Sequence, residues 1–181
     1  MHYRNRVVFG AAVIGVVAQP CVAAYVLLTA ETDGDGLVNA AALLSMASFF
    51  AWLFARIGIQ PLIRCEHGLL SIHNPLLSYR APLSDVQFLA RDGAVGLRIE
   101  GVGVLRPWVL SRSIFDGRRA RSARRELRDL ITEVHVAAPS GTSTDGGPPA
   151  RRWVRRGATD LLLLPPLAFA IWNVIDMLMG N

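Results

Sequence analysis

The sequence predicts an α+β membrane protein: a transmembrane helical hairpin, a small antiparallel β domain with one C-terminal helix, and a third transmembrane helix. Two uncharged apolar runs, Val7–Ala30 and Leu37–Ala55, are each long enough to cross a hydrocarbon core of about 30 Å as a helix. A third apolar run, Leu161–Leu178, follows much later in the chain. Between the second and third runs, short apolar stretches broken by turn residues predict the sheet.

These runs divide the chain into four parts. We expect two transmembrane helices within residues 1–60 (about 7–30 and 37–55, joined by a short external loop), a β domain at 61–136, a flexible linker and basic flank at 137–157, and a third transmembrane helix at 158–181. The Pro165–Pro166 pair should bend or break the third helix, and a re-entrant element is the alternative to a full crossing. Trp153 and Trp172 suit the two interfacial belts of such a span.

Charge placement predicts the topology. The loop after the first run carries Glu31, Asp33 and Asp35, and the arginines that flank the runs are Arg4, Arg6, Arg56, Arg64, Arg151, Arg152, Arg155 and Arg156. Residues 56–157 hold 17 arginines against nine acidic residues. Because basic flanks stay in the cytoplasm, we expect a multi-pass protein of the cell membrane with a cytoplasmic N-terminus and middle domain and an external C-terminus.

A cleaved signal peptide is the alternative for the first run. The run follows a basic segment and ends in Thr29–Ala30, but it is longer than the usual apolar region of about 7–15 residues. Cleavage would leave the middle domain on the same side, because the second span would still run inward.

The middle segment predicts a meander of six or seven short strands. Turn residues separate the apolar stretches at His67–Gly68 and at Asp92–Gly93, which is a strong hairpin signal. The predicted strands are Leu62–Glu66, Leu69–Asn74, Leu76–Arg80, Leu83–Arg91, Ala94–Glu100 and Val104–Leu110.

A helix over Asp116–Val136 is predicted to pack on this sheet. Its apolar residues recur at helical spacing, and Asp116 is placed to cap its first turn. The candidate binding residues lie on its other face: Arg118, Arg119, Arg121, Arg125 and Arg128. Anionic phospholipid or a protein partner would compensate this charge. The alternative is a solvated face, partly paired with Glu126, Asp129 and Glu133.

The segment also carries a family resemblance. GLLSIHNP at Gly68–Pro75 is followed by YRAPLSDV at Tyr79–Val86. With the strand-then-helix order and the preceding hairpin of spans, the chain resembles the small actinobacterial membrane proteins with a bacterial pleckstrin-homology-like (PH-like) domain, the group that includes low-molecular-weight protein antigen 6. The resemblance covers about Ile63–Val136, with Leu83 where the family usually has tryptophan. It implies a PH-like fold and no catalytic residues.

The sequence gives little support for a metal site, a hydrolytic site or nucleic-acid binding. The side chains weighed are Cys65, Glu66, His67 and His73 for a metal, and Asp85, Ser111, Ser113 and Asp116 for hydrolysis. The first group lacks a second closely spaced ligand pair, and nothing resembles a nucleophile elbow or a phosphate loop. We therefore expect no catalytic, cofactor or metal site. Nucleic acid is not the expected partner, because exposed aromatic residues do not alternate with the basic ones.

Three functions remain open. The first is a non-catalytic membrane protein whose cytoplasmic module binds a protein partner or anionic lipid at the inner leaflet. The second is a structural or assembly subunit that contacts other membrane proteins or a second copy of itself. The third is a small transporter or enzyme component, with a path lined by Gln19, Asn39, Asn173 or Asp176.

Overall fold

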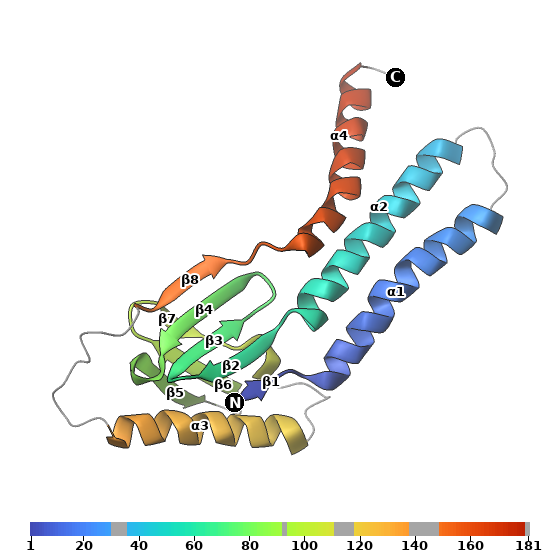
Figure 1. Cartoon of the computed structure of the whole chain (residues 1–181). Coiled ribbons are helices and arrows are strands. Elements are labelled where there is room, and N and C mark those ends of the chain that lie inside the picture. Colours follow the sequence, from blue (N-terminus) through green and yellow to red (C-terminus); the bar gives the residue numbers. More distant parts are fainter. Residues whose placement is uncertain (30–35, 92–93, 111–117, 138–148, 180–181) are drawn as a thin grey trace. The chain divides into compact units, whose positions relative to one another are not determined.

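The computed structural model describes residues 1–29, 36–91, 94–110, 118–137 and 149–179, and the chain forms two compact units (Figure 1). The sheet unit comprises Met1–Val8 and Gln60–Arg155. The helical unit comprises Phe9–Ile59 and Arg156–Asn181. Long apolar helices and antiparallel sheets together confirm the α+β class that the sequence predicts.

The helical unit contains three helices that are long and apolar enough to cross a membrane. These stretches are Arg6–Thr29, Gly36–Ile59 and Ala158–Met179. Within them lie α1 (Arg6–Thr29), α2 (Gly36–Phe54) with the π-helical turn η1 (Ala55–Ile59), and the 3₁₀ helix η4 (Ala158–Leu163) followed by α4 (Leu164–Met179). Because each stretch is almost uncharged, burial in lipid is the environment that its side chains suit.

The first two helices meet where a glycine faces an aromatic ring. A Cβ added at Gly15 of α1 would lie only 2.7 Å from the ring of Phe54 on α2. Small residues at such positions allow close packing between membrane helices. A larger residue at position 15 would displace the ring.

The proline pair lies where the third apolar stretch changes from a 3₁₀ helix to an α-helix, and the helix does not end there. Pro165 and Pro166 fall in the first turn of α4, directly after the 3₁₀ segment η4. Prolines are tolerated in the first turn because those backbone N–H groups have no partner within the helix. The apolar helix therefore continues to Met179.

The sheet unit contains two antiparallel sheets. The five-stranded sheet has the order β1-β2-β3-β4-β8, with strands at His2–Tyr3, Leu62–Glu66, Leu69–His73, Leu77–Pro82 and Arg151–Val154. The three-stranded sheet has the order β5-β6-β7, with strands at Val86–Arg91, Ala94–Ile99 and Gly103–Leu105. The predicted antiparallel sheet is thus confirmed.

The first predicted hairpin forms with a two-residue turn. Glu66 pairs with Leu69, and between them His67 and Gly68 have φ angles of 50° and 72°. Two successive positive φ values match the twist of antiparallel strands, and glycine adopts one without strain.

Several boundaries differ from the prediction. Leu83–Asp85 forms a 3₁₀ turn (η2) before β5, and the last predicted strand ends early, because Pro107 precedes the 3₁₀ turn Trp108–Leu110 (η3) and offers no N–H for pairing. Arg151–Val154, expected in the linker and basic flank, forms β8. The predicted turn Asp92–Gly93, the capping residue Asp116 and residues 138–148 of the linker lie outside the described residues.

Helix α3 (Arg118–Ala137) packs its apolar side on the sheets and completes one core. The apolar spacing seen in the sequence is confirmed, since Ala120, Ala123, Leu127 and Ile131 are buried. The core takes side chains from both sheets, from η3 and from α3. Figure 1 shows α3 running beside the strands.

Candidate functional site

The chain passes between the five-stranded sheet and the apolar helices at three points, all at one end of the sheet. β1 ends at Tyr3 before α1, β2 begins at Leu62 after α2 and η1, and β8 ends at Val154 before η4. The register brings these ends together, because Tyr3 pairs with Ile63, and Val154 pairs with Leu77 at the start of β4. We call this end of the sheet the tether end.

Backbone contacts hold the tether end together. The Arg155 N–H donates to the Leu76 carbonyl at 3.1 Å, and the Arg155 guanidinium donates to the Gln60 carbonyl at 3.2 Å. Further from the tether end, along the β1 edge of the sheet, the terminal amine of Met1 donates to the Cys65 carbonyl at 3.1 Å. Segments far apart in the sequence are thus joined where the chain leaves the sheet.

The five candidate arginines of α3 form an exposed surface. Arg118, Arg119, Arg121, Arg125 and Arg128, here called the arginine face, are all exposed. Their orientation follows from the burial of the opposite side of the helix in the core. Arg124 differs from them, since it is half-buried and donates to the Leu110 carbonyl at 3.0 Å.

None of the arginine-face residues forms an ion pair with another described residue. Arg125 and Asp129 stand at i,i+4, a spacing that permits an ion pair, but the structure contains no ion pair between them; Glu126 and Glu133 lie further round the exposed side. The pairing expected for a solvated face is therefore missing among the described residues. Like charges at the i,i+4 spacing of Arg121 and Arg125 repel, and arginines in the first turn oppose the helix dipole.

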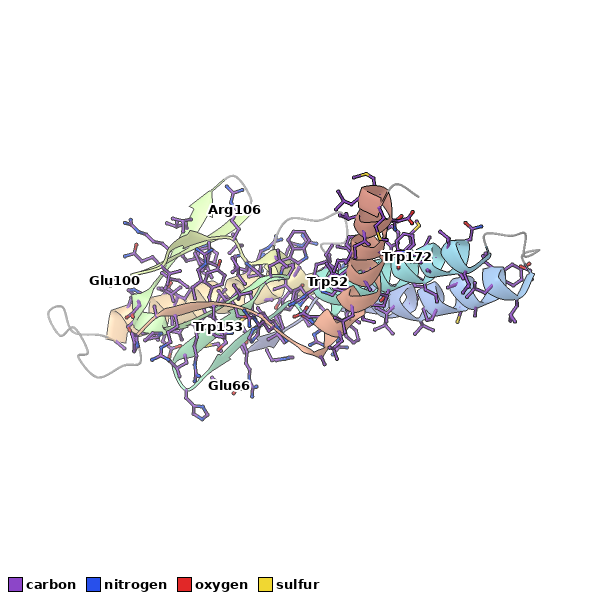
Figure 2. The ribbon with its side chains drawn as sticks, turned by 90° about the horizontal axis from the view of Figure 1, so that it is seen from above. Trp52, Glu66, Glu100, Arg106, Trp153 and Trp172 are labelled. Atoms are coloured by element: carbon purple, nitrogen blue, oxygen red, sulfur yellow. The ribbon has the colours of Figure 1, made fainter. Side chains whose placement is uncertain are left out.

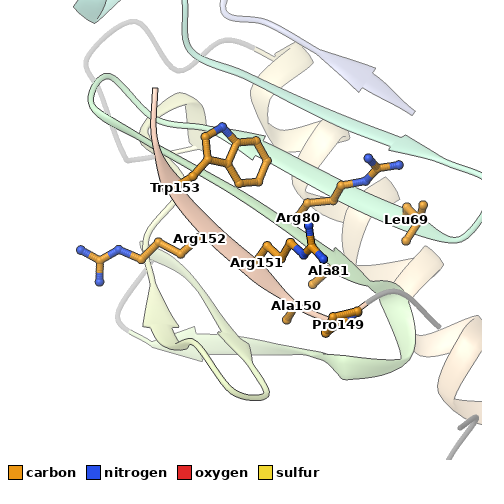
Figure 3. A pocket seen from close by; sticks show the side chains of 8 residues that line it. All are labelled: Leu69, Arg80, Ala81, Pro149, Ala150, Arg151, Arg152 and Trp153. Atoms are coloured by element: carbon orange, nitrogen blue, oxygen red, sulfur yellow. The ribbon is translucent and has the colours of Figure 1, made fainter. Parts of the chain in front are cut away.

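A second basic feature is a pocket of about 780 Å³ beside β8. Its wall includes three arginines, a tryptophan and small apolar residues: Arg80, Arg151, Arg152, Trp153, Ala81 and Ala150. Figure 3 shows Arg80, Arg151 and Trp153 projecting to one side of β8 and Arg152 to the other. Trp153, expected in an interfacial belt, lies on β8 in the sheet unit (Figure 2).

Next to Trp153 lies a histidine whose surroundings favour its neutral form. The His73 and Trp153 rings meet edge to face with centroids 6.5 Å apart, and His73 Nδ1 lies 2.8 Å from Ser78 Oγ. Burial lowers the pKa of His73, and the positive charge of Arg155 lowers it further. At neutral pH the positive charge near this pocket therefore comes from arginine.

The helical unit contains a charged contact between two of its long helices. Asp160 in η4 pairs with Arg56 in η1 and accepts a hydrogen bond from Trp52 Nε1 at 3.1 Å. Its second oxygen accepts from the Gly157 N–H at 3.0 Å. Asp160 thus links the second and third apolar stretches.

Two serines of α2 extend this link. The hydroxyl of Ser48 donates to the Leu162 carbonyl at 2.5 Å. The single hydroxyl hydrogen of Ser45 is shared between the Ala41 carbonyl of its own helix at 2.7 Å and the Pro165 carbonyl at 3.2 Å. The Leu162 carbonyl needs this donor. The backbone nitrogens three and four residues later belong to Pro165 and Pro166, which carry no hydrogen. Ser48 therefore replaces a helical hydrogen bond that the prolines remove.

We expect Ser48→Ala to lower the free energy of unfolding of the full chain by about 1 kcal/mol, because it leaves a carbonyl without a donor in an apolar setting. Ser45→Ala is the matched control with a smaller expected loss, since the Pro165 carbonyl has the Phe169 N–H as its helical donor. Denaturant titration in one detergent compares the two variants. Equal losses would contradict the role given to Ser48.

The residues weighed for metal or hydrolytic chemistry do not form a cluster in the described part of the chain. Cys65 faces the core, and burial raises the pKa of its thiol. His73 lies on the opposite face of the sheet, and Glu66 pairs with Arg64 at 2.6 Å. Ser111, Ser113 and Asp116 lie outside the described residues. Of the polar residues considered for a transport path, Asn173 donates to the Phe169 carbonyl of its own helix at 2.7 Å.

Sequence reasoning found the arginine face but missed the pocket and the Asp160 contact. No alternation of period two marks the strand that lines the pocket, because RRWV has two basic residues followed by two apolar ones. Its position before an apolar run favoured a membrane flank instead. Comparison of the chain with protein-family models, curated proteins and solved structures found no match.

Proposed function

We propose that this chain is a non-catalytic, multi-pass protein of the cell membrane whose PH-like module lies in the cytoplasm and binds anionic lipid at the inner leaflet. The observation that carries the proposal is the tether end, from which the chain continues into three membrane-length helices. A module attached in this way is held close to the bilayer, and weak contacts suffice there.

The tether end also supports the topology. β1 and β2 share one sheet, so the segments before α1 and after α2 lie on the same side of a membrane that these helices cross. The 17 arginines of residues 56–157 favour the cytoplasm as that side. Exposed apolar side chains such as Leu28, Leu161 and Met177 on the long helices suit lipid.

The order of elements supports a PH-like module. Two antiparallel sheets formed by successive short strands are followed by one helix that completes their core. Leu83, at the position where the related proteins usually have tryptophan, is only 3% exposed and belongs to that core. An apolar side chain, here leucine, thus packs into the core at the position where those proteins usually have tryptophan.

The arginine face supports the choice of lipid. Five exposed arginines lack an acidic partner among the described residues, and a basic residue near an anionic membrane contributes about 1 kcal/mol. Binding would remove the repulsion within the helix. A protein partner with an acidic surface would satisfy the same charges, and it is the alternative outcome of the test.

The test measures hydrogen exchange of α3 in the full chain, reconstituted into nanodiscs of neutral or partly anionic lipid. We expect slower exchange in anionic discs at low salt, with the difference lost at high salt because exposed charges are screened. The variant R125Q/R128Q should lose about 2 kcal/mol of lipid interaction. Removing two exposed arginines elsewhere, in R98Q/R106Q, is the matched control and should keep the difference.

Equal exchange in both kinds of disc, at every salt concentration, would contradict lipid binding. Protection that appears only after a cytosolic extract is added would indicate a protein partner instead.

A further inference from the structure

The pocket beside β8 combines features that the arginine face lacks. It is concave, its volume of about 780 Å³ falls within the range of sites for small molecules, and basic groups share its wall with apolar ones. Its arginines and its tryptophan lie on β4 and β8, not on α3. A flat membrane surface does not require such a shape, whereas a discrete ligand does.

Two of its arginines face each other across neighbouring strands. Arg80 on β4 pairs directly with Arg151 on β8, so their side chains leave the same face of the sheet (Figure 3). Like charges placed directly opposite each other destabilise a sheet. Neither arginine forms an ion pair with a described residue. An anion between them would turn this repulsion into attraction.

We propose that this pocket binds the phosphate group of a small phosphorylated ligand between Arg80 and Arg151. Guanidinium groups form paired hydrogen bonds with phosphate oxygens, and two of them neutralise a phosphomonoester. This site goes beyond the proposed function, because it uses different residues and a different kind of ligand from the arginine face.

Trp153 indicates which kind of group is attached to the phosphate of the ligand. It lies on the same side of β8 as Arg151, two residues further along, and its ring contacts His73 edge to face. The exposed fraction of Trp153 is 41%, so part of the side chain remains open to a ligand. A ligand with an apolar or planar group attached to the phosphate would cover this surface.

The phosphate has two possible sources, a lipid headgroup or a soluble phosphate ester. Arg151 lies three residues before Val154, where β8 reaches the tether end, which corresponds to about 10 Å along an extended strand. A soluble ester reaches the pocket from the cytoplasm. A lipid reaches the pocket only when its headgroup extends toward the sheet. The two arms of the experiment distinguish these two sources.

The soluble arm titrates the full chain in neutral phosphatidylcholine nanodiscs with dihexanoyl phosphatidic acid, below its micelle concentration, and with inorganic phosphate. Calorimetry should detect saturable binding. The lipid arm measures hydrogen exchange of residues 149–154 in nanodiscs with and without long-chain phosphatidic acid. Slower exchange is expected if the membrane supplies the phosphate.

R151E is the decisive variant. It places a carboxylate opposite Arg80, so the thermal midpoint should stay the same or rise, because opposite charges across a strand pair attract. Affinity should nevertheless fall by about tenfold or more, since one guanidinium is lost and a like charge meets the phosphate. R98E makes the same charge change at an exposed position of β6 and should leave binding intact.

A signal in either arm that R151E abolishes and R98E retains supports the pocket and identifies the source of the phosphate. The proposal is overturned if neither arm shows binding, or if R98E weakens binding as much as R151E does. Either result leaves the exchange experiment on α3 unaffected, so the two proposals can fail separately.

Discussion

Replacing Asp160 with asparagine is expected to lower the free energy of unfolding of the full chain by about 3 kcal/mol. The side chain of Arg56 is only 6% exposed, and Asp160 supplies its negative partner. Trp52 lies in the same contact, with the Arg56 guanidinium 5.9 Å from the centre of its ring. The D160N variant removes the negative charge that Asp160 places beside this buried guanidinium. We place the loss at the low end for buried pairs because Asp160 is 31% exposed.

The measurement is reversible unfolding in neutral-lipid bicelles, with D176N as the matched control. Asp176 is exposed on α4, so the same chemical change there should cost less than about 0.5 kcal/mol. The double variant R56Q/D160N should recover part of the loss, because the uncompensated charge is then absent. Equal effects of D160N and D176N would show that the contact does not hold the spans together.

This contact bears on the function as well as on stability. Arg56 and Asp160 lie within a few residues of Gln60 and Arg155, where the longer segment of the sheet unit begins and ends. In the proposed topology this pair lies on the cytoplasmic side of the second and third spans. The link therefore joins the second and third apolar stretches within the helical unit, close in sequence to the residues that lead into the sheet unit.

Much of the fold could be predicted because its signals are local. A long uncharged run predicts an apolar helix whatever its neighbours are, and two residues such as His67–Gly68 suffice to specify a hairpin. The apolar stripe of α3 likewise appears in the sequence at helical spacing. These elements depend on residues that are close together in the chain.

The missed features depend on partners that are distant in the chain. β1 has two residues and β8 has four, and neither would be a strand without β2 or β4 beside it. The pocket follows from that pairing, since only the register places Arg151 opposite Arg80. The Arg56–Asp160 pair had a signal, a basic residue ending one apolar run and an acidic residue beginning another. Without the packing of the helices, that signal did not identify a contact.

The docking of α3 provides the second large expected effect. Leu127→Ala should lower the free energy of unfolding by about 2–5 kcal/mol, because it removes buried methyl groups and leaves a cavity. Leu127 is fully buried in the core that α3 shares with both sheets. The arginine face is presented by this helix alone. The same variant should therefore speed hydrogen exchange throughout Arg118–Ala137, even where the fold survives.

Leu76→Ala is the matched control, since it removes the same atoms from a leucine of the sheet unit that is 57% exposed. Its expected loss is below about 0.5 kcal/mol, with unchanged exchange in α3. If Leu127→Ala also behaved in this way, α3 would not be docked through its apolar side. Its arginines would then have no fixed orientation, and lipid binding would depend on their number and not on the face that the core presents. Leu127→Met keeps most of the side-chain volume. Compared with Leu127→Ala, this variant should therefore regain the free energy of unfolding and the slow hydrogen exchange of α3.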